Sequence, residues 1–252
     1  MAAVAGRIYA SVHPFKSYFR VEGLQFSAVA NQIYFKQAQQ NIAANPDGSL
    51  TFVASRNVLV IQDGGLTQAG VFDGGAASHV STIPVGGPME WVGDRLWVAR
   101  GSRVFGSDIA NPLSFLEPQY ISGVASFLFP GPVTALTKTP TAPQQSQLLV
   151  FTEDSTHLLQ AGIRDRTTWQ VTPDFQREIF PKIGCSSQRS VVAHFGFVYW
   201  YSRHGLTSMD TASQSFVSSE LPYEDGAMED SKAHLSSDLS TVACGTFENY
   251  LL

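Results

Sequence analysis

Charge is scarce in this sequence of 252 residues, since Asp, Glu, Lys and Arg make up only 15% of it. Typical soluble domains contain roughly 25% of these residues. The net charge is -5, and no run of Lys or Arg occurs. A protein that grips nucleic acid needs a basic patch, because phosphate neutralisation supplies most of its non-specific affinity. The composition therefore excludes tight DNA binding, whereas a mildly acidic surface would suit a wall along which DNA slides.

Cysteine is also scarce, and Cys185 and Cys244 are the only two. Neither lies at the CxxC or Cys/His spacing of a zinc site, so we expect two buried thiols, with a disulfide between them left open. The N-terminus lacks the regions of a signal peptide, and no stretch approaches the ~20 apolar residues of a membrane span. We expect a soluble protein that has no membrane partner and is made in the cytoplasm.

Catalytic motifs are missing as well. The sequence has no GxSxG elbow, no P-loop and no GxGxxG. Nothing assembles a nucleophile, a base and an orienting group, and a propeller hydrolase or lyase would need a cluster of acids or metal ligands. We therefore predict a protein that is not an enzyme, with no catalytic residues, no cofactor and no metal site.

What the sequence does contain is turn residues and aromatic residues, with 21 Gly, 13 Pro and 17 Phe, which favour short strands. Strand-like runs surround hairpin turns at Gly64, Gly101, Asp154 and Gly205, which are 37, 53 and 51 residues apart. Four-stranded propeller blades repeat at about 40–50 residues. We predict an all-β, β-propeller-like domain over residues 46–252, with about four to five blades of antiparallel strands. A β-sandwich or a stacked irregular β-domain is the alternative.

The two ends of the chain differ from this repeat. Residues 1–45 are interpreted as an N-terminal arm or docking segment, with a strand or two and a short helix over residues 37–44. A fifth unit begins at Thr241, and the sequence ends at Leu252 in what looks like a strand. Because an open sheet edge invites aggregation, either the sequence is part of a longer one, or the arm or a neighbouring subunit completes the incomplete last blade.

Two groups of charged residues are candidates for a subunit interface. Arg95, Arg100 and Arg103 lie close together on a predicted hairpin, as either a cradle for an anionic ligand or an exposed set of solvated or inter-subunit ion pairs. We favour the interface, because Arg is enriched in subunit contacts. Glu224 and Asp225 begin an acidic loop whose spacing does not match an EF-hand, so we expect a solvated loop or a subunit contact.

Other conspicuous residues have structural interpretations. Asp108 resembles a catalytic acid, but we expect it to cap the turn before Asn111. His194 and His204 flank an aromatic strand without a metal-binding partner, so we expect satisfied core or turn histidines. The tryptophans could form a sugar-binding platform, but we expect them to pack between blades; they are Trp91, Trp97, Trp169 and Trp200.

Two segments carry a resemblance to a known family. Residues 83–115 begin IPVGGPMEWVGDRLWVA, and residues 183–206 begin IGCSSQRSVV and continue to an aromatic strand and a Gly hairpin. Together they resemble β-propeller proteins of phage tails, such as nozzle or tail tubular B-type proteins and related DNA-stabilisation proteins. The resemblance covers roughly residues 50–252.

The resemblance implies a virion structural protein of the phage tail. Such proteins form a ring, commonly of six copies, below the portal and adaptor, and the ring is part of the channel that retains and conducts the genome. The partners would be other copies of the chain and other tail proteins, and DNA would pass without specific binding. Low charge agrees with permanent burial in an assembly. The alternative is a tail propeller that binds host-surface glycans, which requires exposed aromatic residues on one face.

Overall fold

The structure is a computed structural model, and its described residues are 2–4, 7–13, 17–21, 24–27, 32–43, 52–120, 123–140, 147–194, 196–203, 205–210, 215–218, 246–247 and 250–251. No helix in this described part is long and apolar enough to cross a membrane. The chain forms two compact units: residues 1–100 with 105–120, and residues 101–104 with 121–252.

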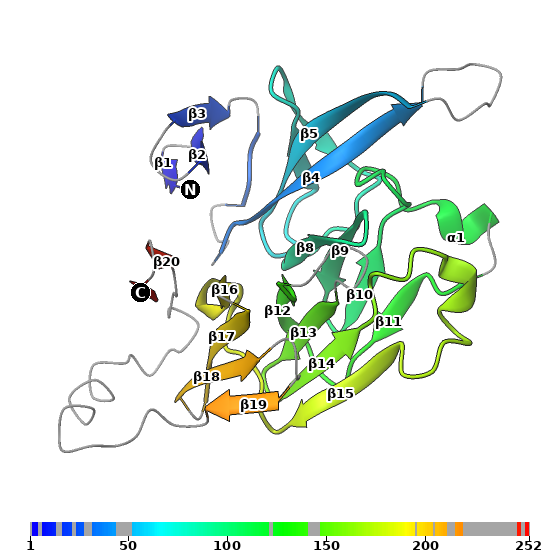
Figure 1. The fold of residues 1–252 in the computed structure, drawn as a ribbon. Coiled ribbons are helices and arrows are strands. Elements are labelled where there is room, and N and C mark those ends of the chain that lie inside the picture. Colours follow the sequence, from blue (N-terminus) through cyan, green and yellow to red (C-terminus); the bar gives the residue numbers. More distant parts are fainter. Residues whose placement is uncertain are drawn as a thin grey trace. The chain divides into compact units, whose positions relative to one another are not determined.

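The architecture is all-β, and four successive four-stranded sheets dominate it (Figure 1). Each sheet consists of strands that are consecutive in the sequence and hydrogen-bonded in that order. Such a four-stranded antiparallel meander is the blade unit of β-propellers. The predicted all-β, propeller-like fold with about four to five blades is therefore confirmed, with four such sheets in the described residues.

The hairpin turns predicted from the repeat also lie at equivalent positions in the four sheets. Gly64, Gly101 and Asp154 lie in the turns between the second and third strands of the first three sheets, and Gly205 begins the third strand of the fourth. Gly101 and Gly205 have φ values of 56° and 109°, in the left-handed region that favours glycine. Turn chemistry therefore marks one equivalent hairpin in every sheet.

The first sheet contains β4 (Tyr34–Ala43), β5 (Phe52–Gln62), β6 (Ala69–Phe72) and β7 (Ala77–Val80). The helix predicted over residues 37–44 is wrong, because β4 pairs with β5 along its whole length.

The physical reason is pairing with a partner strand. Ala38 lies opposite Val58 on the buried face, while the neighbouring Gln37 and Gln39 are exposed, which is the two-residue period of a strand. β5 is also one strand rather than the two predicted around residue 56. The predicted boundary between arm and β-domain at residue 45 falls between β4 and β5, within this sheet.

The second sheet contains β8 (Met89–Val92), β9 (Arg95–Arg100), β10 (Arg103–Gly106) and β11 (Ser126–Leu128). The first three strands lie where they were predicted. The connection from β10 to β11 includes the short helix α1 (Glu117–Tyr120).

The third sheet contains β12 (Val133–Lys138), β13 (Leu148–Thr152), β14 (Ser155–Leu159) and β15 (Gln176–Pro181). Its central hairpin, β13–β14, was predicted, and its outer strands were not. The 3-10 helix η2 (Arg166–Thr168) lies between β14 and β15.

The fourth sheet contains β16 (Val192–His194), β17 (Phe197–Ser202), β18 (Gly205–Asp210) and β19 (Ser215–Ser218). The 3-10 helix η3 (Gln188–Ser190) precedes it.

Two smaller sheets lie near the ends of the sequence. β1 (Ala2–Val4), β2 (Arg7–His13) and β3 (Ser17–Val21) form one, and β20 (Thr246–Phe247) pairs with β21 (Tyr250–Leu251) in the other. The start of the predicted fifth unit, at Thr241, lies outside the described residues.

Each unit has an apolar core between successive sheets. In the first unit the first strands of two sheets, β4 and β8, contact each other, and β12 and β16 do so in the second. The first-unit core includes Val60, Leu96 and Val98, and the second-unit core includes Phe151 and Trp200. β8 and β12 are mostly buried, whereas β15 is mostly exposed and β7 has no buried residue.

A glycine connector joins the first sheet to β8, the first strand of the second sheet. The backbone N–H of Gly86 donates to Oε1 of Gln62 on β5 (2.5 Å), and that of Gly87 donates to the carbonyl of Ala99 on β9 (2.9 Å). A Cβ atom at position 86 would lie 2.2 Å from the Ala99 carbonyl oxygen. The chain can pass between the sheets here only without a side chain.

The connector of the second unit, residues 183–185, also passes too close to neighbouring backbone for a side chain, and it makes more hydrogen bonds. Its three successive carbonyls accept hydrogen bonds from Thr156 Oγ1 (2.7 Å), Trp200 Nε1 (3.1 Å) and Thr134 Oγ1 (2.7 Å), which lie on three different strands. A Cβ atom on Gly184 would lie 2.3 Å from backbone atoms of the preceding hairpin. The connector thus satisfies its buried carbonyls while touching the neighbouring backbone.

We expect Gly184→Ala to destabilise the protein by at least ~2 kcal/mol, because the clash is with backbone that cannot rotate away. Gly131→Ala is the matched control, since its Cβ would meet only Thr152 Cβ at 3.9 Å. Thermal unfolding followed by circular dichroism should give a midpoint several degrees lower for Gly184→Ala alone. Equal midpoints for the two variants would contradict the close approach.

Candidate functional site

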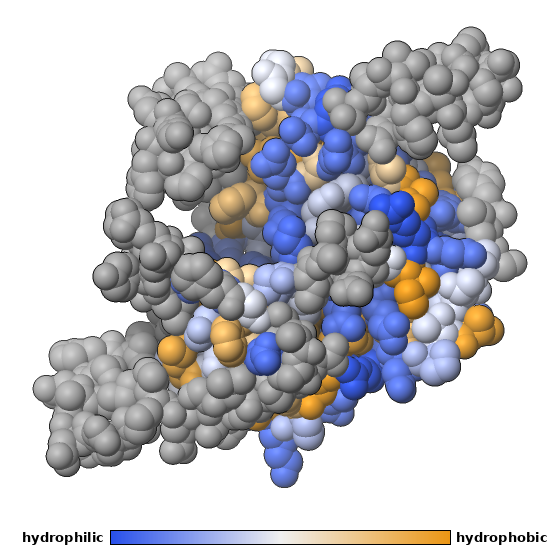
Figure 2. All heavy atoms as spheres, viewed as in Figure 1, coloured by the Kyte–Doolittle hydropathy of each residue, from blue (hydrophilic) through white to orange (hydrophobic). Residues whose placement is uncertain are grey.

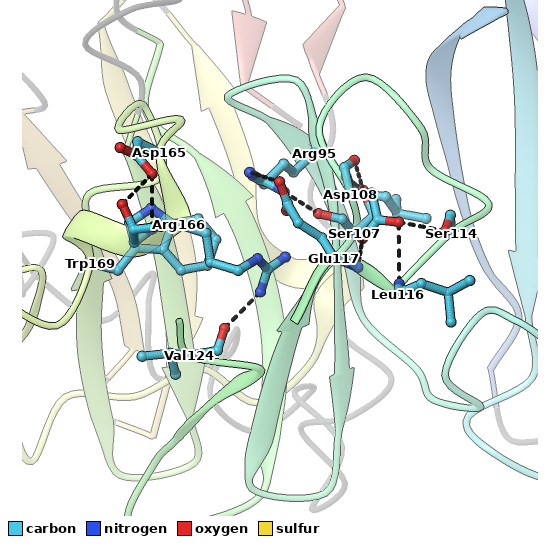
Figure 3. Close-up of polar contacts among 12 residues, drawn as sticks. Arg95, Ser107, Asp108, Ser114, Leu116, Glu117, Val124, Asp165, Arg166 and Trp169 are labelled. Atoms are coloured by element: carbon cyan, nitrogen blue, oxygen red, sulfur yellow. Dashed lines mark hydrogen bonds and ion pairs between the residues drawn. The ribbon is translucent and has the colours of Figure 1, made fainter. Parts of the chain in front are cut away.

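The most elaborate polar cluster in the described residues surrounds Arg95 on β9 (Figure 3). This arginine is 1% exposed. Its Nη1 donates to the Ser107 carbonyl (2.6 Å) and to Oε2 of Glu117, and its Nη2 donates to Oε1 of Glu117 (3.2 Å). The guanidinium therefore pairs with the carboxylate through two donors, the geometry that arginine favours.

Asp108 organises the loop that contains this carboxylate. Its side chain accepts from Ser114 Oγ (2.5 Å) and from the backbone N–H groups of Leu116 (3.2 Å) and Glu117 (2.7 Å). The N–H of Asn111 donates to the Asp108 carbonyl (3.2 Å). The side chain binds backbone amides, as predicted, but these belong to the loop after Asn111, up to the first residue of α1, and not to the turn before it (Figure 3).

The three arginines predicted at one exposed interface do not share a surface. Arg95 is buried and paired internally, contrary to the exposed position expected, because β9 is a central strand whose residues 95–99 are all buried. Arg100 and Arg103 are exposed at the β9–β10 hairpin, and Arg103 Nη1 donates to Ser126 Oγ (3.1 Å). An interface role for these two stays a prediction. Glu224 and Asp225 lie outside the described residues.

A second buried arginine, Arg166, lies in η2 and is 1% exposed. Its Nη1 donates to the Val124 carbonyl (2.7 Å), and its guanidinium carbon lies 4.7 Å from the centroid of the Trp169 ring. Asp165 begins the same turn, and its side chain accepts from the Thr167 N–H (2.9 Å). Figure 3 shows Asp165 beside Arg166 and the contact of Arg166 with Val124. Sequence reasoning did not find this arginine, because a single Arg in a polar loop gives no signal of burial.

Trp169 continues into an aromatic stack with Phe127 and Phe175, whose ring centroids lie 5.1–5.7 Å apart. The stack forms the floor of a shallow hollow of about 400 Å³ beside the exposed Leu128. Trp169 is only 2% exposed. The rings therefore serve mainly as packing.

The other tryptophans are also packing residues. Trp97 and Trp200 are completely buried, and Trp91 is half-buried against the first-unit core. The indole N–H of Trp97 donates to the Val92 carbonyl (3.1 Å). The predicted packing between blades is confirmed for Trp200, which lies in the core between the third and fourth sheets, and Trp91 packs in part against the core between the first and second. Trp169 packs against Phe127 and Phe175 instead.

The structure also contains a buried Ser–His pair that was not predicted from the sequence. Ser155 Oγ lies 2.7 Å from Nε2 of His157 and 2.8 Å from Oγ1 of Thr152. The two residues alternate on β14 and so share one face, a signal that strand periodicity could have given. Such a distance suits a nucleophile and its base. Both residues are only 5% exposed, however, so the pair acts as a structural hydrogen-bonded chain.

Burial lowers the pKa of the His157 imidazole, and the cross-strand Glu178 carboxylate opposes this effect in part. The ring also packs edge-on against Phe129, with 5.2 Å between ring centroids. A neutral His157 is therefore favoured in the folded protein.

The remaining candidates have simple positions. Cys185 is a buried thiol, as predicted, with Sγ 3.1 Å from Ser190 Oγ and 3.2 Å from the Ser187 carbonyl. His194 is half-buried on β16. Among the described residues no group of three His, Cys, Asp or Glu could hold a metal ion. Cys244 and His204 lie outside the part of the chain that the structure describes.

Comparisons with known proteins give one kind of match. No protein-family model matches the sequence, and no curated protein matches it significantly. Two solved structures of BBS1N in complex with ARL6DN, one soaked with mercury and one with lead, are similar with a TM-score of 0.41 and 20% identity. Each match covers 64% of this chain and about half of the other chain, 49% and 50% respectively.

We expect Glu117→Gln to cost about 3–5 kcal/mol, because it leaves the buried Arg95 guanidinium without its counter-charge. The matched control is Glu153→Gln, which removes an exposed carboxylate from its contact with Arg203 and should cost under ~1 kcal/mol. Urea unfolding followed by tryptophan fluorescence measures both. Similar midpoints would show that the buried pair contributes no more than an exposed one.

We expect stability to fall as the pH decreases below the ordinary histidine value of 6.5, because the pKa of His157 is lowered in the folded state. The unfolded chain then binds the proton more readily, so protonation favours unfolding, while the penalty is absent at higher pH. Urea unfolding between pH 7.5 and 5 should show a smaller decrease for His157→Gln than for the unmodified protein. If stability decreases as much in His157→Gln as in the unmodified protein, His157 is not the source of this pH dependence.

Proposed function

We propose that this chain is a structural subunit of a phage tail, in the nozzle or tail hub, that helps to form the channel through which the genome is retained and conducted. The proposal rests on the structural role of the two segments that resemble phage-tail propeller proteins. Residues 83–115 and 183–206 include both glycine connectors, the β8–β10 strands, the Asp108 loop and the β17–β18 hairpin. These residues build the propeller-like framework, which agrees with a protein that works by shape and assembly.

The distribution of charge supports the same proposal. The buried Arg95 and Arg166 make contacts inside the protein, and the Asp108 carboxylate accepts hydrogen bonds within its own loop. Figure 2 shows hydrophobic residues interspersed among hydrophilic ones on the visible face. Exposed large apolar side chains occur at several separate positions, and these are Phe35, Leu66, Ile109, Leu116, Leu128 and Val171. Copies of a chain with this surface can associate without burying many unpaired charges.

We further propose that copies form a closed ring, commonly a hexamer in the resembling family, with adaptor, portal or other tail proteins as neighbours. A ring repeats one heterologous contact around its axis. Arg100 and Arg103 are candidates for that contact because both are exposed on one hairpin. DNA would pass through without specific binding, in line with the net charge of -5. The glycan-binding alternative has less support, because three of the four tryptophans are buried and Trp91 is half-buried.

The test is assembly of the purified full chain, measured by light scattering and negative-stain electron microscopy over a range of concentrations. We expect closed rings, and gold-labelled antibodies should mark the tail of the virion. Arg100→Glu with Arg103→Glu should weaken ring formation at least ten-fold if both make charged contacts of about 1 kcal/mol or more. Arg177→Glu, on the exposed β15, is the matched control.

A chain that remains monomeric at every concentration and labels no part of the virion would overturn the proposed function. Rings that form equally well in the double variant would retain the function and remove the two arginines from the contact.

A further inference from the structure

Residues 24–27 form a short strap on the first sheet. Leu24 is 2% exposed and packs with the completely buried Ile61 of β5. A Cβ atom on Gly70 of β6 would lie 2.7 Å from Cδ1 of Leu24 and 2.9 Å from Cζ of Phe26. The strap therefore occupies the space that a side chain at position 70 would fill.

One polar attachment of the strap is a carboxylate. The Ser27 N–H donates to Oδ2 of Asp63 (3.0 Å), and the Thr67 hydroxyl donates to the same oxygen. Oδ1 of Asp63 accepts from the backbone N–H groups of Leu66 and Thr67. Burial alone would raise the pKa of Asp63, but these hydrogen bonds together lower it below its ordinary 3.8. Asp63 consequently stays ionised at neutral and weakly acidic pH, and this attachment does not change there.

The other attachment is the imidazole of His79 on β7. Nδ1 lies 2.9 Å from the Gln68 carbonyl, and Nε2 lies 3.3 Å from the Gln25 backbone N–H. A carbonyl only accepts, so Nδ1 must carry the hydrogen, and a backbone N–H only donates, so Nε2 must be unprotonated. The Phe26 ring packs against the imidazole with 5.6 Å between ring centroids. Both contacts are satisfied only by the neutral ring with its hydrogen on Nδ1.

Protons can reach this ring. His79 is exposed and lines a hollow of about 590 Å³ together with Gln25, Leu66 and Gln68. Histidine is the side chain whose charge ordinarily changes between pH 5 and 8. A proton on Nε2 would set one N–H against the Gln25 N–H and remove the acceptor.

We propose that His79 is an acid-sensitive latch that holds the strap on the first sheet at neutral pH and releases it when the imidazole is protonated. Among the described residues, Asp63 brings a charge to this strap from the loop between β5 and β6. Arg56 and Asp73 pair with each other at the opposite end of β6. Release would uncover Ile61 and Gly70, an apolar strip on the first sheet.

Hydrogen exchange of the full chain tests the latch. Protection of the Gln25 amide, corrected for intrinsic exchange chemistry, should fall about five-fold from pH 7.5 to 5.5, which corresponds to the loss of one hydrogen bond. His79→Gln should show no such fall, because its side chain stays neutral. His157→Gln is the control, and it should retain the fall because the His157 ring is hydrogen-bonded to Ser155 in the other unit.

The latch is wrong if the unmodified protein keeps equal protection at both pH values, or if the fall persists in His79→Gln. Asp63→Asn separates the two attachments. This variant should lower the protection of the Gln25 amide at both pH values and leave the ratio of the two protection values unchanged. If the pH effect is lost in this variant, the response belongs to Asp63 instead.

Discussion

The close approach of backbone to backbone at the glycine connectors is the constraint on which the paired sheets of each unit depend. At Gly86 and Gly184 a Cβ atom would lie 2.2–2.3 Å from the backbone of a neighbouring strand or hairpin. At this spacing, side chains such as Gln62 and Trp200 can bridge from a strand to the connector. The buried peptide groups are thereby satisfied by protein partners, and the sheets can share an apolar core.

Two buried arginines extend this framework into the longer loops. Burying a charge is costly, and a buried pair is weak evidence for stability, since apolar residues could often replace it. A bidentate pair does, however, require one geometry, and Arg95 with Glu117 sets the position of α1 relative to β9. Arg166 similarly anchors η2 to the Val124 carbonyl. Both arginines specify loop conformations that apolar contacts alone would leave less defined, which suits a framework protein.

The four predicted hairpins were correct because turn chemistry and alternating apolar residues are local signals. The outer strands were harder to recognise. β15 is largely exposed, so it has no apolar alternation to detect, and β11 has only three residues. β4 was mistaken for a helix because Gln and Ala favour helices when no partner is considered, and pairing with β5 overrides that preference.

The amino-acid sequence by itself determined the all-β class and the phase of the four-stranded repeat, because turns and strand periodicity involve residues close together in the chain. Only the tertiary structure decided which charged residues are buried and which neutral tautomer of His79 is held. Arg95 and Arg100 are alike in sequence, yet one is enclosed in a central strand and the other is exposed at its end. That difference arises from the covering of β9 by residues distant in the sequence, which no local pattern records.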